Sequence, residues 1–219
     1  QTYLSQKKHH PVTAKGELVY RVRQGKIAKH ERYLALWCLC WRAKQGDKTV
    51  RTQPQLSLHF EFYAVLQGNY KDAIDVDRHI QMLPSTIGEM VGLEKLSFYG
   101  HNISSLPDSI GNLTQLQTLD LRANALVDLP DSIANLSKLR DLWLAGNQFQ
   151  EIPQSLLELT QLESLGIGKG LSTLPNQIAN LSNLKTLYLD DNQLSSLPEE
   201  LGALQALEEL SLTGARGTL

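Results

Sequence analysis

The chain has 219 residues, 42% of them apolar, and a net charge of −2, a composition typical of a globular protein with one domain or two small ones. It contains no run of eighteen apolar residues, and its first eleven residues are polar and basic. We therefore expect neither a membrane-spanning helix nor a signal peptide. Cys38 and Cys40 cannot pair with each other on a helix, which favours a reducing compartment and a cytoplasmic protein.

Charge is distributed unevenly along the chain. Residues 1–60 contain twelve Lys or Arg against three acidic residues, whereas residues 61–219 contain nine against twenty. The basic excess lies near Tyr20, Tyr33, Trp37 and Trp41, a combination that suggests binding to nucleic acid or to an anionic membrane. Alternatively, the aromatic residues are core and the charges are solvated or face the acidic part. We favour this second interpretation.

The first predicted unit is a basic, mainly helical region over residues 1–70. Apolar residues recur at helical spacing over residues 26–44, and Gly46 then ends the helix. A second helix is predicted over residues 54–67, bounded by Pro54 and Gly68, although Leu56, Leu58 and Phe60 alternate as a strand would. Residues 71–82 form the next unit, in which residues 73–77 are predicted to be a capping strand.

The third predicted unit, residues 83–219, is an internal repeat. The dipeptide Leu-Pro or Ile-Pro recurs with spacings of 23, 23, 23, 22 and 23 residues. The six pairs begin at Leu83, Leu106, Leu129, Ile152, Leu174 and Leu197. Such regularity defines six units, the last of them incomplete, and a period of this length is typical of a solenoid.

Each unit combines two apolar periods. The Leu-x-Leu step, as in Leu119-Asp120-Leu121, has a period of two and predicts a short strand with its leucines inward. The Ile-x-x-Leu-x-x-Leu step has helical spacing, and the preceding Pro suits the start of a helix or 3₁₀ turn. One strand and one turn per unit cannot bury a core alone, so the units must stack.

The pattern Leu-x-x-Leu-x-x-Leu-x-Leu-x-x-Asn-x-Leu, present from Leu113 to Leu126 and from Leu181 to Leu194, resembles the leucine-rich repeat family. The 23-residue type resembles intracellular Ras-associated and Roco-type scaffolds, and effectors that bacterial pathogens deliver into host cells. The resemblance implies an α/β fold, a right-handed horseshoe with a parallel concave sheet. It also implies a protein partner, and a place in the cytoplasm of the cell itself or of a host.

Departures from the family pattern occur in single repeats. The turn Asn is present at Asn124, Asn147 and Asn192, but the fourth unit is one residue short and has Gly168-Lys169-Gly170 there. We predict a distorted turn at this place. With Gly166, these glycines either make a notch in the binding face or reflect neutral drift of the repeat.

The residues between and beside the inward leucines are predicted to face solvent on the concave sheet. Trp143 is a large aromatic residue in a row that should face water, and binding hot spots are rich in Trp, Tyr and Arg. Alternatively, Trp143 and Tyr188 only cover the sheet. The predicted partner-binding residues are Tyr99, Asp120, Arg122, Asp141, Trp143, Tyr188 and Asp190.

No chemistry-bearing motif accompanies the repeats. We find no paired carboxylates in a defined cleft, no glycine-rich phosphate loop and no activated nucleophile, and the histidines lack ligand spacing. The sequence therefore predicts no enzyme, no metal and no cofactor. It favours a module that binds a partner protein as the recognition part of a larger regulator or bacterial effector.

Overall fold

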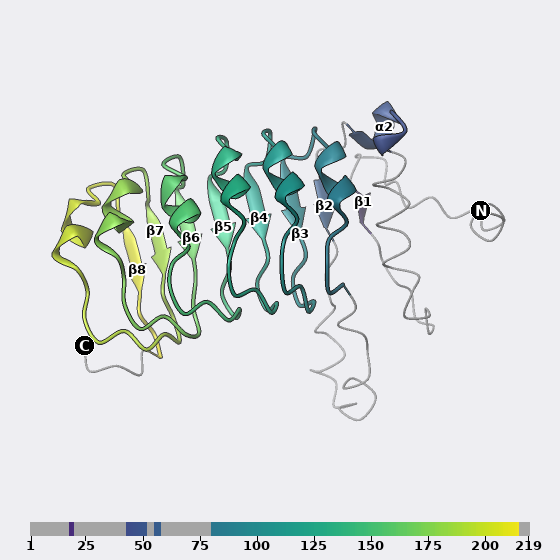
Figure 1. Cartoon of the computed structure of the whole chain (residues 1–219). Coiled ribbons are helices and arrows are strands. Elements are labelled where there is room, and N and C mark those ends of the chain that lie inside the picture. Colours follow the sequence, from purple (N-terminus) through teal and green to yellow (C-terminus); the bar gives the residue numbers. More distant parts are fainter. Residues whose placement is uncertain (1–17, 20–42, 52–54, 58–79, 215–219) are drawn as a thin grey trace, which may run out of the picture.

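The computed structural model describes residues 18–19, 43–51, 55–57 and 80–214. In the repeats, three-residue strands alternate with five-residue 3₁₀ helices (Figure 1). The elements before the repeats are β1 (Leu18–Val19), α2 (Lys48–Arg51) and β2 (Gln55–Ser57). The later strands are β3 (Lys95–Ser97), β4 (Thr118–Asp120), β5 (Asp141–Trp143), β6 (Ser164–Gly166), β7 (Thr186–Tyr188) and β8 (Glu209–Ser211). The 3₁₀ helices are η1 (Ser85–Glu89), η2 (Asp108–Asn112), η3 (Asp131–Asn135), η4 (Gln154–Glu158), η5 (Asn176–Asn180) and η6 (Glu199–Ala203).

The eight strands among the described residues form one parallel sheet in chain order. The middle residues of neighbouring strands are aligned, so that Leu119 pairs with Leu142 and Leu142 with Leu165. Each repeat therefore contributes one strand, which pairs with the strand of the next repeat. The result is a solenoid, with a parallel sheet along one side and the 3₁₀ helices along the other (Figure 1).

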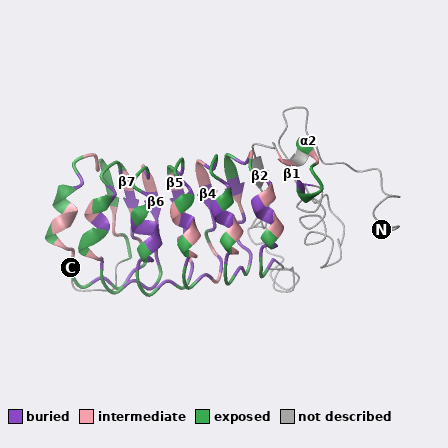
Figure 2. Ribbon diagram, turned by 45° about the horizontal axis from the view of Figure 1, so that its top comes forward, coloured by how far each residue is buried: buried purple, intermediate pink, exposed green. Residues whose placement is uncertain are grey.

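The inward leucines form one continuous core along the solenoid. Leu119, Leu142 and Leu187 are fully buried, as are the residues of the helical step such as Ile133 and Leu136. In Figure 2 buried residues recur in each repeat, while exposed residues lie mainly on the 3₁₀ helices and loops. The core is thus shared between neighbours, which explains why one repeat cannot fold alone.

Proline starts each of the 3₁₀ helices. Pro107, for example, has a φ of −73° and precedes η2, and Pro130, with a φ of −67°, precedes η3. The fixed φ of proline suits this position, and its missing N–H costs nothing there. The helical part of each repeat is therefore confirmed as a 3₁₀ turn.

Small residues allow the first 3₁₀ helices to stack closely. A Cβ atom on Gly88 or Gly111 would lie 2.4 Å from the carbonyl oxygen of Ser109 or Ser132 in the next helix, far inside van der Waals contact. The same position of η4 holds Leu157, which is 1% exposed. The fourth repeat therefore departs from the others on its helical side as well as in its turn.

The turn asparagines join neighbouring repeats through buried hydrogen bonds. Asn147 Nδ2 donates to the carbonyls of Leu121 (2.9 Å) and Leu144 (2.8 Å), and its Oδ1 accepts from the N–H of Leu126 (3.0 Å). Asn124 and Asn192 bond in the same way to their own neighbours. Each such side chain pairs backbone groups that would otherwise be buried without a partner.

The turn of the fourth repeat, predicted to be distorted, lacks the asparagine but keeps the backbone conformation of the other turns at its left-handed residue. Lys169 has a φ of +90°, and Gly146, at the equivalent place in the third repeat, has a φ of +76°. The left-handed turn is therefore retained. Asn192 of the next repeat accepts from the N–H groups of both Gly170 (3.1 Å) and Leu171 (3.0 Å), which ties the shortened turn to its neighbour.

One prediction for the N-terminal region needs correction. The helix predicted over residues 54–67 is wrong at its start, because residues 55–57 form β2, whose Leu56 pairs with Leu96 of β3. At residues 55–57 the alternation of apolar residues that includes Leu56 and Leu58 correctly indicates a strand. Residues 73–77, predicted to be a capping strand, lie outside the described residues.

The remaining N-terminal predictions lie largely outside the described residues. Of the helix predicted over residues 26–44, the structure describes Ala43 and Lys44, which are helical, and Gly46 follows with a φ of +83°. The cysteines and the aromatic residues of the basic region are not among the described residues. Binding of nucleic acid or an anionic membrane through that region stays a prediction.

Candidate functional site on the sheet face

The solvent-facing residues of β3–β8 form the concave face, in three rows across the strands. The strand register aligns Ser97, Asp120, Trp143, Gly166, Tyr188 and Ser211 as the middle row. It likewise aligns Lys95, Thr118, Asp141, Ser164, Thr186 and Glu209 as the preceding row. The third row, two residues after the middle one, contains Tyr99, Arg122 and Asp190. The predicted alignment of the residues across the strands is confirmed, whereas Asp120 and Gly166, which were predicted to face solvent, are buried.

Arg122 is held in place by Asp120. Its Nε donates to Asp120 Oδ1 (2.9 Å) and its Nη2 donates to Oδ2 (2.8 Å), a forked pair. These bonds raise the pKa of Arg122 above its ordinary value against the opposing effect of burial. The Asp120 side chain is 11% exposed but that of Arg122 is 45% exposed, so the guanidinium remains accessible.

Two aromatic rings flank the Arg122 guanidinium. Its Cζ lies 5.4 Å from the ring centroid of Tyr99 and 5.9 Å from that of Trp143, both within the range of a cation–π contact. Three neighbouring strands thereby contribute to one arrangement of rings and charge. The fork to Asp120 fixes the guanidinium between the rings.

Trp143 also stacks on Tyr188, across the intervening strand β6. Their ring centroids lie 5.8 Å apart at an interplanar angle of 27°. The stack passes over Gly166, where a Cβ atom would lie 2.8 Å from Trp143 Cε3. Gly166 is buried, so the predicted notch is filled by Trp143. The interpretation that the two rings cover the sheet is correct at Gly166, but both rings are only half-buried.

Carboxylates surround the stacked pair. A hydrogen bond with Glu209, together with burial and its negative charge, raises the pKa of Tyr188 above its ordinary value. Asp190 Oδ1 accepts from Ser211 Oγ (2.5 Å) and from the Thr213 N–H (2.8 Å). On the other side of the pair, Asp141 Oδ2 accepts from Thr118 Oγ1 (3.1 Å).

The structure therefore joins five of the seven predicted residues in one series. Tyr99, Arg122 with Asp120, Trp143 and Tyr188 follow one another by direct contact, while Asp141 and Asp190 stand beside it. Sequence reasoning missed Glu209, although it lies in a row that the repeat period defines. It also missed that Gly166 is the site that accepts the Trp143 ring.

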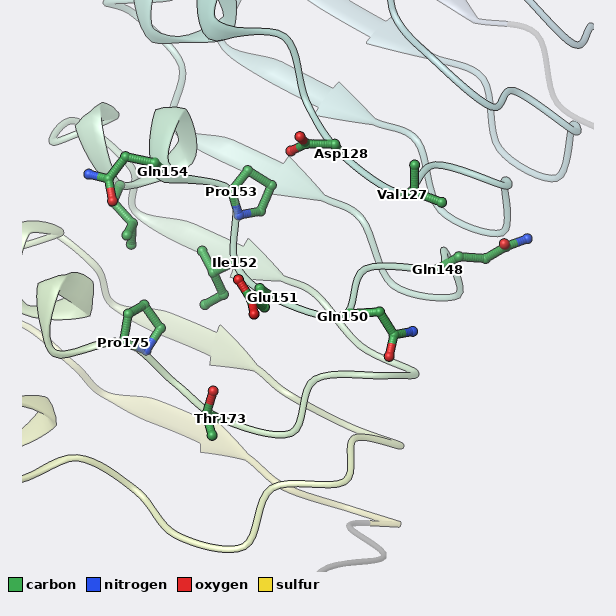
Figure 3. A pocket seen from close by; sticks show the side chains of 11 residues that line it. Val127, Asp128, Gln148, Gln150, Glu151, Ile152, Pro153, Gln154, Thr173 and Pro175 are labelled. Carbon is green, nitrogen blue, oxygen red and sulfur yellow. The ribbon is translucent and has the colours of Figure 1, made fainter.

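A second concavity lies away from this face, between the loops and the 3₁₀ helices of the second to fifth repeats (Figure 3). Ile152, Pro153 and Leu157 contribute apolar lining, and Asp128 and Glu151 contribute carboxylates. Val127 at its border is 60% exposed. Nothing in the repeat pattern predicted this groove.

The described ranges contain neither a metal-binding cluster nor a membrane-spanning helix. No group of three or more His, Cys, Asp or Glu residues there is arranged to hold a metal ion. None of the helices among these residues is long and apolar enough to cross a membrane.

Comparison with known families identifies the class of protein. The family model described as a leucine-rich repeat region matches residues 47–167 and 132–218. The chain therefore belongs to the leucine-rich repeat family. The match begins before Leu83 and includes β2, in agreement with the pairing of β2 to β3.

Several solved structures resemble the chain. A leucine-rich repeat protein of Leptospira interrogans is 37% identical over 64% of this chain and 36% of that one, with a TM-score of 0.60. An internalin of Listeria monocytogenes is 28% identical over 62% and 39%, with a TM-score of 0.53. The Arabidopsis receptor kinase HAESA is 32% identical over 62% and 24%, with a TM-score of 0.54. The chain thus spans well under half of each. No curated protein matches it in sequence.

Proposed function

We propose that this chain is a protein-interaction module that binds a partner protein through its concave face. In the same proposal it is the recognition part of a larger regulator or of a bacterial effector, and it acts by binding rather than by catalysis. The single observation that carries this proposal is the series from Tyr99 through Arg122 and Trp143 to Tyr188, which crosses strands β3 to β7.

The composition of the series favours binding over simple cover for the sheet. Tyr, Trp and Arg are the residues most enriched at the energetic centres of interfaces. Arg122 is already fixed by Asp120 and two rings, so less side-chain entropy is lost when a partner contacts it. Strands spaced about 4.8 Å apart make β3–β8 roughly 25 Å wide, enough for an interface of ordinary size.

The similar structures support a binding role without naming the partner. HAESA was solved in complex with a peptide hormone and a co-receptor. By analogy, the repeats of this chain present an aromatic face to a protein or peptide. Two of the structures named above are of bacterial proteins, which supports a bacterial recognition protein.

The test is affinity capture with the chain in wild-type form and as the double variant Trp143→Ala, Arg122→Ala. We expect the wild type to retain a partner that the double variant loses, because both ends of the central contact are removed. A matched control is Val127→Ala, Lys138→Ala, which truncates two exposed residues away from the concave face. Urea unfolding of each variant checks that the fold is retained.

The control variant should capture as the wild type does. A partner that binds the folded Trp143, Arg122 double variant with undiminished affinity would place binding elsewhere on the chain and would contradict the proposal.

A further inference from the structure

Building on the proposed function, we infer that the β7–β8 end of the concave face binds an arginine side chain of the partner. The guanidinium would lie on the Tyr188 ring, beside the carboxylates of Asp190 and Glu209. The partner is thereby defined by its chemistry, as a segment that presents arginine to the concave face.

Charge complementarity is the first argument. In the three outward rows of β5–β8, all of which the structure describes, the charged residues are Asp141, Asp190 and Glu209. These rows contain no Lys or Arg. The basic residues at the rim, Arg140 and Lys185, are both bonded to Glu163. This end of the face is therefore negative and suits a cationic partner.

The other end of the same face shows how a guanidinium is held. At β3–β4, Arg122 lies over Tyr99 and Trp143 and is forked to Asp120. At β7–β8 the chain presents an aromatic ring and carboxylates again but supplies no cation of its own in the outward rows. A partner arginine would complete there the arrangement that Arg122 completes at β4.

Space and hydrogen-bonding capacity agree with this placement. Trp143 covers the side of Tyr188 that faces β6, whereas the strand on the other side carries Ser211 in the middle row, a small residue that leaves the ring accessible. Both hydrogen bonds to Asp190 reach Oδ1, so Oδ2 is the oxygen that a partner N–H can approach. A planar guanidinium can stack on the ring and donate to a carboxylate simultaneously, which an ammonium does less well.

The experiment is a selection of random short peptides, displayed on phage, against the full 219-residue chain. A parallel selection uses the double variant Asp190→Asn, Glu209→Gln, which removes both charges and retains the side-chain shapes. Its matched control is Asp128→Asn, Glu151→Gln, which removes two charges from the remote groove of Figure 3.

We expect peptides enriched on the wild type and on the control to contain arginine well above its frequency in the starting library. The same excess should be absent after selection on the Asp190, Glu209 variant. A synthesised arginine-containing peptide should bind that variant roughly three- to thirtyfold more weakly than the wild type, as expected for the loss of two exposed charge contacts.

Three outcomes would overturn the inference: no enriched peptide, enrichment without an arginine excess, or an arginine excess that persists on the Asp190, Glu209 variant. Each leaves the proposed function intact if the enriched peptides, or the captured partner, still require Trp143. By contrast, arginine-rich peptides that bind the Trp143→Ala, Arg122→Ala chain as tightly as the wild type would contradict the proposed binding through the series from Tyr99 to Tyr188. The Asp190, Glu209 variant would then test separately where the arginine binds.

Discussion

The third repeat, residues 129–151, and the fourth, residues 152–173, share the same buried core but differ wherever a neighbouring repeat comes close. The third supplies Trp143 and Asn147, both of which reach over adjacent repeats. The fourth has Gly166 on its outward strand face, over which the Trp143 ring lies, and its turn donates two hydrogen bonds to Asn192 of the fifth repeat. On the sheet face, the third repeat supplies the large side chain and the fourth supplies the space for it, so the arrangement of the candidate binding face depends on both repeats.

The largest expected effect comes from Asn147→Ala. The change leaves the carbonyl of Leu144 and the N–H of Leu126 without their side-chain partner in a buried turn, and leaves the carbonyl of Leu121 with Asn124 Nδ2 as its side-chain donor. We expect the free energy of unfolding to fall by about 3 to 5 kcal/mol. Urea unfolding measures the loss, and hydrogen exchange should place it in the third and neighbouring repeats.

Asn183→Ala is the control for this change. Asn183 is exposed and donates one bond, to the carbonyl of Thr160 (2.8 Å), so its loss should cost less than about 1 kcal/mol. Equal losses for the two variants would mean that the buried asparagine bonds do not hold the repeats together.

Gly168→Ala tests the close approach between the fourth repeat and the fifth. A Cβ atom at this position would lie 2.3 Å from the carbonyl oxygen of Asp190, and because that atom belongs to the backbone, strands β6 and β7 must separate. We expect a loss of about 2 to 3 kcal/mol in the free energy of unfolding. The reverse change in the third repeat, Ala145→Gly, should cost no more than about 1 kcal/mol. A Gly168→Ala chain as stable as the wild type would contradict the close approach.

Gly166→Ala tests the aromatic stack with a smaller effect on stability. The added methyl group would meet Trp143 Cε3 at 2.8 Å, and the indole can move away at a cost of about 1 kcal/mol. We expect a changed Trp143 fluorescence spectrum and weaker partner binding. The spectrum of a Trp143→Phe chain identifies which part of the fluorescence comes from Trp143. If that part is unchanged by Gly166→Ala, the ring does not rest on Gly166.

The smallest expected effect concerns Glu163, at the rim of the fourth repeat. Hydrogen bonds from Lys185 and from Arg140 lower the pKa of Glu163, and the bond with Glu163 raises the pKa of Lys185. The Glu163 contribution is therefore present above its unfolded pKa and is lost as the pH falls through the lowered folded value. The Lys185 contribution is present below its unfolded pKa and is lost as the pH rises through the raised folded value.

Because Arg140 and Lys185 are exposed and Glu163 is half-buried, salt screens these ion pairs, and Glu163→Gln should reduce stability less than any change above. Unfolding curves at neutral pH in low and high salt provide the measurement. A difference between wild type and Glu163→Gln that does not shrink in high salt would show that the side chain acts through packing instead of charge.

Repeat-level features were predictable because they follow from period alone. The Leu-Pro spacing placed the 3₁₀ helices, and the Leu-x-Leu step placed the strands and the rows of the concave face. The failures lie where the period is broken. Residues 55–57 pair with β3 although their partners in register are 40 positions away, and no 23-residue count finds such a strand. There, pairing with an open sheet edge overrode the helix-start signal of Pro54.

The sequence alone determined the family, the parallel register and the set of outward residues, because an apolar repeat of constant length allows each side chain one orientation relative to the core. Only the tertiary structure decided which outward residues touch. Trp143 and Tyr188 are 45 positions apart and meet because β6 carries Gly166 between them, and Arg122 is fixed by rings from the strands on either side. Contacts between repeats depend on side-chain size at aligned positions, and that alignment exists only once the strands have paired.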